Sequence, residues 1–106
     1  MPEYIVKIKN HYLLWSTISD RPVTGAMTLV ELKKHYRRKY GEDGIGDLDS
    51  RLRRVEEKGT SSIDDQSVYE TISLNRAGPR ETRLTMVEIE QAYCLRQPIR
   101  GGWLPE

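Results

Sequence analysis

The residues best suited to binding chemistry form a dense run of positive charge, Lys33-Lys34-His35-Tyr36-Arg37-Arg38-Lys39. This run holds five cationic side chains and no acid. If it is helical with Tyr36 turned inward, then Lys34, Arg37 and Arg38 face solvent. A later cluster adds Arg51, Arg53 and Arg54. Together these six side chains form a candidate surface for the phosphates of a nucleic acid or for an acidic protein partner.

A solvated helix face is the alternative interpretation of this charge. Between residues 28 and 58, nine basic residues accompany seven acidic ones, so the local net charge is only +2. Basic side chains near the carboxyl end of a helix are also favoured by the helix dipole. Both interpretations remain open from the sequence.

Patterns for catalysis or metal binding are weak. The chain has two histidines, His11 and His35, and one cysteine, Cys94. No two of them lie at ligand spacing, and a structural zinc site takes about four such ligands. A lone cysteine in a helix is usually a small buried hydrophobe. We therefore predict no metal, no cofactor and no enzymatic activity, with a small enzyme that uses Cys94 or a carboxylate as the remaining alternative.

Two tryptophans are candidate recognition anchors, because tryptophan is enriched at interface hot spots. Trp15 lies in an apolar run and is expected in the core or on a hairpin face. Trp103 follows Gly101-Gly102 in a stretch with no regular pattern, where we expect a mobile ring. Trp103 is therefore the better anchor candidate.

The elements that must position these residues begin with a predicted β-hairpin. Tyr4 to Lys9 and Tyr12 to Ile18 are rich in β-branched and aromatic residues and flank a short polar step. An isolated hairpin is marginally stable, so its apolar face must pack on other elements. Residues 19–26 contain Pro22 and Gly25 and are expected to be a connecting loop.

Helices are predicted to follow. Thr28-Leu-Val-Glu31 is a capping box that opens a helix over about 29–40, which Gly41 ends. Residues 41–46 are expected to be a turn-rich linker, and a second helix begins at Asp47 or Asp49 and ends at Lys58.

The remainder of the chain is less regular in pattern. Thr60-Ser61-Ser62 offers caps for a third element over 63–74, a helix or a strand. Gly78 is expected to supply an unusual backbone angle. Thr85-Met-Val-Glu88 is a second capping box whose helix runs to about Leu95.

Length and composition set the class of protein. The chain has 106 residues, with 17 basic and 16 acidic side chains and 37% hydrophobic residues. These values suit one small domain, predicted over 1–96 with an irregular tail at 97–106. No apolar run is long enough to cross a membrane, the amino terminus lacks a signal-peptide pattern, and a lone cysteine excludes an intrachain disulfide. A cytoplasmic location fits best. We predict an α+β fold in which an N-terminal antiparallel β-hairpin packs against three or four short helices.

A resemblance to known proteins rests on four short motifs: Tyr12-Leu-Leu-Trp15-Ser, Pro22-Val-x-Gly25-x-Met27, Lys58-Gly-Thr-Ser-Ser62 and Asn75-Arg-Ala-Gly-Pro79. With these motifs the chain resembles small uncharacterised proteins encoded in phages and prophages. The resemblance implies a lone domain that works by binding a host or phage component, and it implies no residue role.

We therefore predict a non-enzymatic interaction protein, an inhibitor or regulator with a protein partner and no membrane partner. A nucleic-acid-binding protein that uses the basic surface is the alternative. The edge of the hairpin also leaves self-association open, because an unpaired strand edge must be covered or paired.

Overall fold

A three-stranded antiparallel sheet lies at the centre of the protein, in a computed structural model that describes residues 3–63 and 66–105. Strands β1 (Glu3–Ile8) and β2 (His11–Ser16) form the predicted hairpin, with Tyr4 opposite Trp15. Strand β3 (Arg21–Pro22) pairs with the end of β2, within the segment predicted to be a loop. Two residues that end in proline carry no strand signal, and proline is tolerated there because β3 lies at the edge of the sheet.

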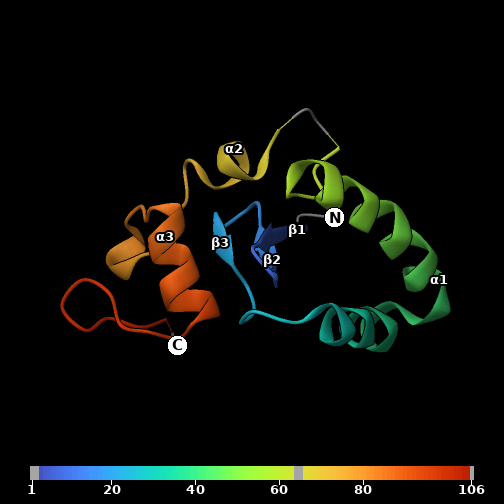
Figure 1. The fold of residues 1–106 in the computed structure, drawn as a ribbon, viewed down its shortest axis with the longest axis horizontal. Helices are drawn as coiled ribbons and strands as arrows, with labels where there is room; N and C mark the ends of the chain where they lie inside the picture. Colours follow the sequence, from blue (N-terminus) through green and yellow to red (C-terminus); the bar gives the residue numbers. More distant parts are fainter. Residues whose placement is uncertain (1–2, 64–65, 106) are drawn as a thin grey trace.

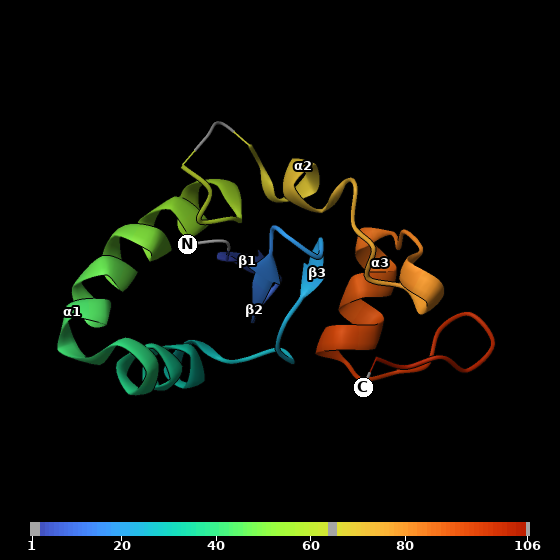
Figure 2. The same cartoon turned by 180° about the vertical axis from the view of Figure 1, so that it is seen from behind.

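Both faces of the sheet are buried. Ile5 and Leu14 pack on one side against a long helix, whereas Val6 and Leu13 pack on the other side against the C-terminal elements. Figures 1 and 2 show the sheet between these two layers. The hairpin was expected to bury one apolar face. The continuous apolar runs in β1 and β2 instead fill both faces, as in strands covered on each side.

Both outer edges of the hairpin are hydrogen-bonded to the chain itself. The Lys7 N–H donates to the Gly59 carbonyl (2.8 Å), and the Ser61 N–H donates to the Ile5 carbonyl (2.9 Å). Beside β2, Tyr12 and Met27 exchange two backbone hydrogen bonds of 2.9 Å. At these positions the backbone groups of the hairpin edges are already paired within the chain, so they offer no free edge for self-association.

Helix α1 (Leu29–Lys58) is longer than predicted. It begins at the expected capping box, in which Thr28 and Glu31 are bonded in both directions, and ends with Gly59 at φ 82°. The expected linker over 41–46 is wrong: only Gly41 leaves the helical conformation, with φ 71° and ψ −160°. Such angles are essentially confined to glycine. Gly41 therefore bends one helix into two halves, which Figure 1 shows at an angle around the sheet.

Short elements make up the C-terminal layer. They are helix α2 (Val68–Ile72), the 3₁₀ turn η1 (Pro79–Glu81), helix α3 (Met86–Ile89) and the π-helical turn η2 (Glu90–Cys94). The capping box predicted at Thr85 is confirmed, with both of its hydrogen bonds present. A third one, Ser67-Val-Tyr-Glu70, opens α2 and was missed.

Residues 60–74 differ in part from the expectation for the middle of the chain. Thr60, Ser61 and Ser62 are buried along β1 and do not cap a helix. The third element, expected over 63–74, is helical over Val68–Ile72, while residues 64 and 65 of that span lie outside the described residues.

The fold is therefore α+β, with the sheet packed against one long helix and two short ones rather than three or four short helices. In the segments that the structure describes, no helix combines the length and apolar character needed to cross a membrane.

Candidate functional site

A groove of about 590 Å³ opens between β3, the turn at η1 and the end of the chain. Its apolar lining comes from aromatic rings, a leucine and prolines: Pro22, Pro79, Tyr93, Trp103, Leu104 and Pro105. Charged side chains line it as well, namely Arg21, Arg80 and Glu81. We call this feature the Trp103 groove. Polar groups provide more of its exposed surface than apolar groups do, so it is a polar groove that contains apolar side chains.

The backbone of Trp103 is held in place by a closed loop. The Trp103 N–H donates to the Ile99 carbonyl (2.7 Å), and the Ile99 N–H donates to the Trp103 carbonyl (3.0 Å). Gly101 and Gly102 make the turn between them, with φ values of 75° and 91° that favour glycine. The two glycines therefore allow a tight turn that places Trp103 in the groove lining, and the expected mobility of its ring stays a prediction.

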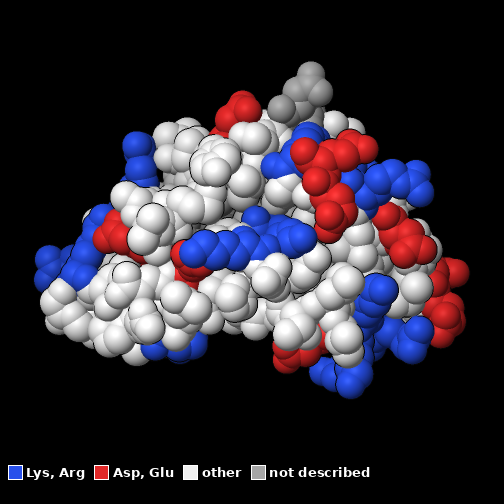
Figure 3. All heavy atoms as spheres, viewed as in Figure 1, with Lys and Arg blue, Asp and Glu red and all other residues white. Residues whose placement is uncertain are grey.

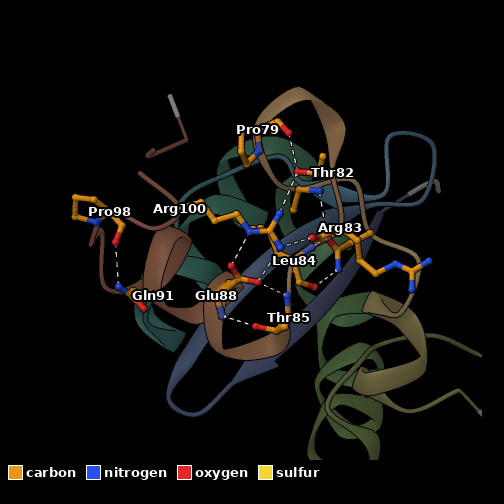
Figure 4. Close-up of polar contacts among 11 residues, drawn as sticks. Pro79, Thr82, Arg83, Leu84, Thr85, Glu88, Gln91, Pro98 and Arg100 are labelled. Carbon is orange, nitrogen blue, oxygen red and sulfur yellow. Dashed lines mark hydrogen bonds and ion pairs between the residues drawn. The ribbon is translucent and has the colours of Figure 1, made fainter. Parts of the chain in front are cut away.

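Arg100 attaches this loop to α3, as Figure 4 shows. Its Nε donates to Glu88 Oε2 (2.8 Å), and its Nη2 donates to Glu88 Oε1 (3.1 Å) and to the Arg83 carbonyl (2.9 Å). Glu88 Oε1 also accepts from the Thr85 N–H in the capping box (2.9 Å). One carboxylate therefore both caps α3 and holds the loop that carries Trp103.

This double role predicts a pH-dependent attachment. The Arg100 guanidinium and the Thr85 N–H lower the pKa of Glu88 from 4.5 to about 2. A carboxylate whose pKa is lower in the folded state stabilises that state above its unfolded pKa. Wild type is therefore expected to be more stable than Arg100→Gln at neutral pH. This difference should shrink as the pH falls from about 4.5 through about 2.

Urea denaturation of both proteins across this pH range measures the effect. Arg53→Gln is the matched control, since Arg53 is exposed on α1. Its difference from wild type should stay small and flat with pH. A stability difference between wild type and Arg100→Gln that persists unchanged to pH 2 would show that Glu88 does not provide the attachment.

The wall of the Trp103 groove contains strained backbone. Arg80 and Glu81 follow each other with φ values of 56° and 59°, in the left-handed region that non-glycine residues rarely adopt. The turn is closed by the Gly78 N–H, which donates to the Thr82 carbonyl (2.8 Å). Such strain often accompanies binding sites, where surrounding contacts hold it.

Gly78 has a different role from the one predicted. Its φ of −87° is ordinary. A Cβ at this position would, however, come within 2.6 Å of Thr82 Oγ1 and 2.8 Å of Leu84 Cδ2. Glycine is needed here for space, while the unusual angles fall on Arg80 and Glu81.

Three of the predicted basic residues share one exposed helix face. Lys34, Arg37 and Arg38 are exposed on the first half of α1, and Arg37 has a loose ion pair with Glu42 (3.7 Å). Figure 3 shows basic side chains gathered at lower right, over this half of the helix, with acidic side chains beside them. This part of the predicted surface is accessible to a partner.

The other predicted arginines are used differently. Arg51 Nε donates to Asp47 Oδ2 (2.6 Å), and the Arg51 side chain is only 14% exposed. Arg54 Nε donates to the Ser61 carbonyl (2.8 Å), which ties α1 to the segment beside β1. Arg53 is exposed. The bend at Gly41 turns the second half of α1 away from the first, so the six residues do not lie on one straight helix face.

Cys94 lacks the surroundings of an activated nucleophile. It is partly buried, and burial together with the charge of Glu90 raises the pKa of its thiol to about 11. A thiol must ionise to act as a nucleophile, so this environment disfavours reaction at neutral pH. Among the residues that the structure describes, no three His, Cys, Asp or Glu side chains are grouped to hold a metal ion.

Sequence reasoning identified Trp103 but missed the rest of the groove. Arg21, Arg80 and Tyr93 come from three separate segments, and no local pattern links them. The Gly78-Pro79 pair was the nearest signal, since it marked a turn at this place.

Comparisons with known proteins yield no match. No family model fits the sequence, and the searches of curated proteins and of solved structures found no significant similarity. Function is therefore inferred from the geometry of the groove.

Proposed function

We propose that this protein is a non-enzymatic interaction module that binds a segment of a partner protein in the Trp103 groove. The observation that carries the proposal is the groove itself. About 590 Å³ of space is lined by two aromatic rings, a leucine and three prolines beside charged side chains. In keeping with the resemblance to phage and prophage proteins, we propose that the partner is a host or phage component which this protein inhibits or regulates.

The groove is suited to a peptide segment because its aromatic anchors are held before binding. The Trp103 backbone is bonded to Ile99, and its side chain packs against the buried cluster that contains Tyr93. The Tyr93 hydroxyl donates to the Ala77 carbonyl (2.6 Å). Anchors that are ordered in advance reduce the entropy lost on association. Grooves lined by aromatic side chains also accept extended segments of a partner chain.

Loss of the Trp103 ring is expected to abolish most of the binding. In a first step, Leu104, which is 37% exposed, is replaced with a photo-crosslinking residue to capture the partner. In a second step, binding of the purified partner is measured by calorimetry. Trp103→Ala should weaken it about 30-fold or more, the loss typical of an interface hot spot.

Val87→Ala is the matched control, because Val87 is exposed on α3 and outside the groove lining. It should bind the partner as wild type does. If Trp103→Ala keeps its fold by circular dichroism and binds as tightly as the control, the groove is not the binding site.

A nucleic-acid interface on α1 is the second candidate. The observation in its favour is the exposed face with Lys34, Arg37 and Arg38. It is the weaker candidate because Arg51 and Arg54 have partners within the chain, which leaves fewer cations for phosphate contacts.

A further inference from the structure

We propose that the segment bound in the Trp103 groove is acidic, with an apolar side chain on the aromatic floor and carboxylates beside it. This inference rests on the proposed function and names the chemistry of the partner. It follows from the charged side chains in the groove lining and beside it.

Three arginines lie in the groove lining or beside it. Arg21 from β3 and Arg80 from η1 belong to its lining. Arg96 follows η2, and its Nη2 donates to the carbonyl of the lining residue Pro105 (3.1 Å). Arg21 and Arg96 both act electrostatically on the Tyr93 hydroxyl and oppose the rise in its pKa that burial causes. Positive charge therefore reaches the floor of the groove as well as its rim.

Among the described residues of the lining, the one acid offsets this charge only weakly. Glu81 Oε1 lies 3.8 Å from Arg21 Nη2, and the two side chains are 61% and 44% exposed. Exposed pairs at such distances contribute little, because water solvates both partners. A carboxylate of an incoming segment can therefore replace Glu81 beside Arg21 at small cost.

Glu81 is then a competitor of the ligand. While it stays in the groove wall, it neutralises part of the charge that would attract an acidic segment. Its removal should strengthen binding, whereas removal of Arg21 should weaken it. A loss of groove structure would weaken binding in both variants. Opposite changes in affinity therefore distinguish a charge effect from such a loss.

The test uses short random peptides displayed on phage and selected on the purified full chain. Peptides that also bind Trp103→Ala are removed. The remaining peptides should be rich in Asp and Glu around an aromatic, leucine or proline residue. Because rim charges are screened by salt, affinity for these peptides should fall as the salt concentration rises.

One selected acidic peptide then serves as the probe for the variants. Arg21→Gln is expected to weaken its binding about threefold to fivefold, and Glu81→Gln is expected to strengthen it about twofold to threefold, changes of the size that exposed charge pairs produce. Glu42→Gln is the matched control. It removes another exposed acid from a loose arginine pair, at Arg37 on α1 and outside the groove lining, and should leave the affinity unchanged.

The outcomes separate the two proposals. Trp103-dependent peptides of neutral or basic composition, or a Glu81→Gln variant that binds no better than wild type, would overturn the acidic partner and leave the groove as a binding site. If no peptide depends on Trp103, the proposed function fails and the acidic partner fails with it.

Discussion

Replacing Asn75 with alanine is expected to destabilise the folded protein by about 3–5 kcal/mol. The Asn75 amide is buried, and its Nδ2 donates to the carbonyls of Ile72 (2.7 Å) and Leu84 (2.8 Å). Its Oδ1 accepts from the backbone N–H groups of Leu84 (2.8 Å) and Ala77 (3.2 Å). Alanine would leave buried backbone groups without these partners, and each loss costs about 1–3 kcal/mol. Urea denaturation at neutral pH measures the change.

Two further variants make this prediction specific to the hydrogen bonds. Asn75→Asp keeps both acceptor bonds but turns a carboxylate oxygen toward two carbonyls, so the pKa of the new acid should rise on folding. Its stability relative to wild type should therefore increase as the pH falls, because the folded state then binds more protons. Asn10→Ala, in the exposed turn between β1 and β2, is the control and should change stability by no more than about 0.5 kcal/mol.

Loss of Asn75 should also weaken binding. Its hydrogen bonds close the segment between Ile72 and Leu84, which contains the groove residues Pro79, Arg80 and Glu81. If Asn75→Ala were as stable as the Asn10→Ala control, the amide would not be the organising contact of this segment.

The second large effect is expected at the bend of α1, where Gly44→Ala should cost about 3 kcal/mol. The added Cβ would lie 2.3 Å from the Tyr40 Cβ. That atom is the root of a side chain, so no rotamer change relieves the clash and the backbone of the bend must shift. Thermal and urea denaturation measure the loss.

Two neighbouring glycines provide matched variants. Gly41→Ala meets no atom but must adopt φ 71° and ψ −160°, which should cost about 1–3 kcal/mol through backbone strain alone. Gly46→Ala also meets no atom and lies in exposed, regular helix. It should stabilise the protein by up to about 1 kcal/mol, since alanine is the better helix former. A destabilising Gly46→Ala together with a neutral Gly44→Ala would contradict the packing at this bend.

The starting signals of α1 and α3 were readable from the sequence, whereas that of α2 at Ser67 was missed. Thr28-x-x-Glu31 and Thr85-x-x-Glu88 form the capping boxes predicted for them, because the partners of these hydrogen bonds lie within one turn. The hairpin pairing was equally local, since a short polar turn joins its strands. Interactions between residues a few positions apart are determined by nearby side chains alone.

The continuation of α1 as a helix after Gly41 could not be predicted from neighbouring residues. Glycines and acids over 41–46 indicate a turn when they are considered locally. In the folded chain, Ile45 and Leu48 pack with Leu14 of the sheet, and this burial favours helix over the local preference.

The sequence by itself determined the starts of α1 and α3, the hairpin, the α+β class and Trp103 as a candidate anchor. Only the tertiary structure decided which backbone groups close the hairpin edges and which cations remain accessible. It also decided that β3, η1 and the end of the chain meet around Trp103. The physical reason is distance along the chain: the groove joins residues from Arg21 to Pro105, and no local spacing encodes contacts that depend on the packing of the whole fold.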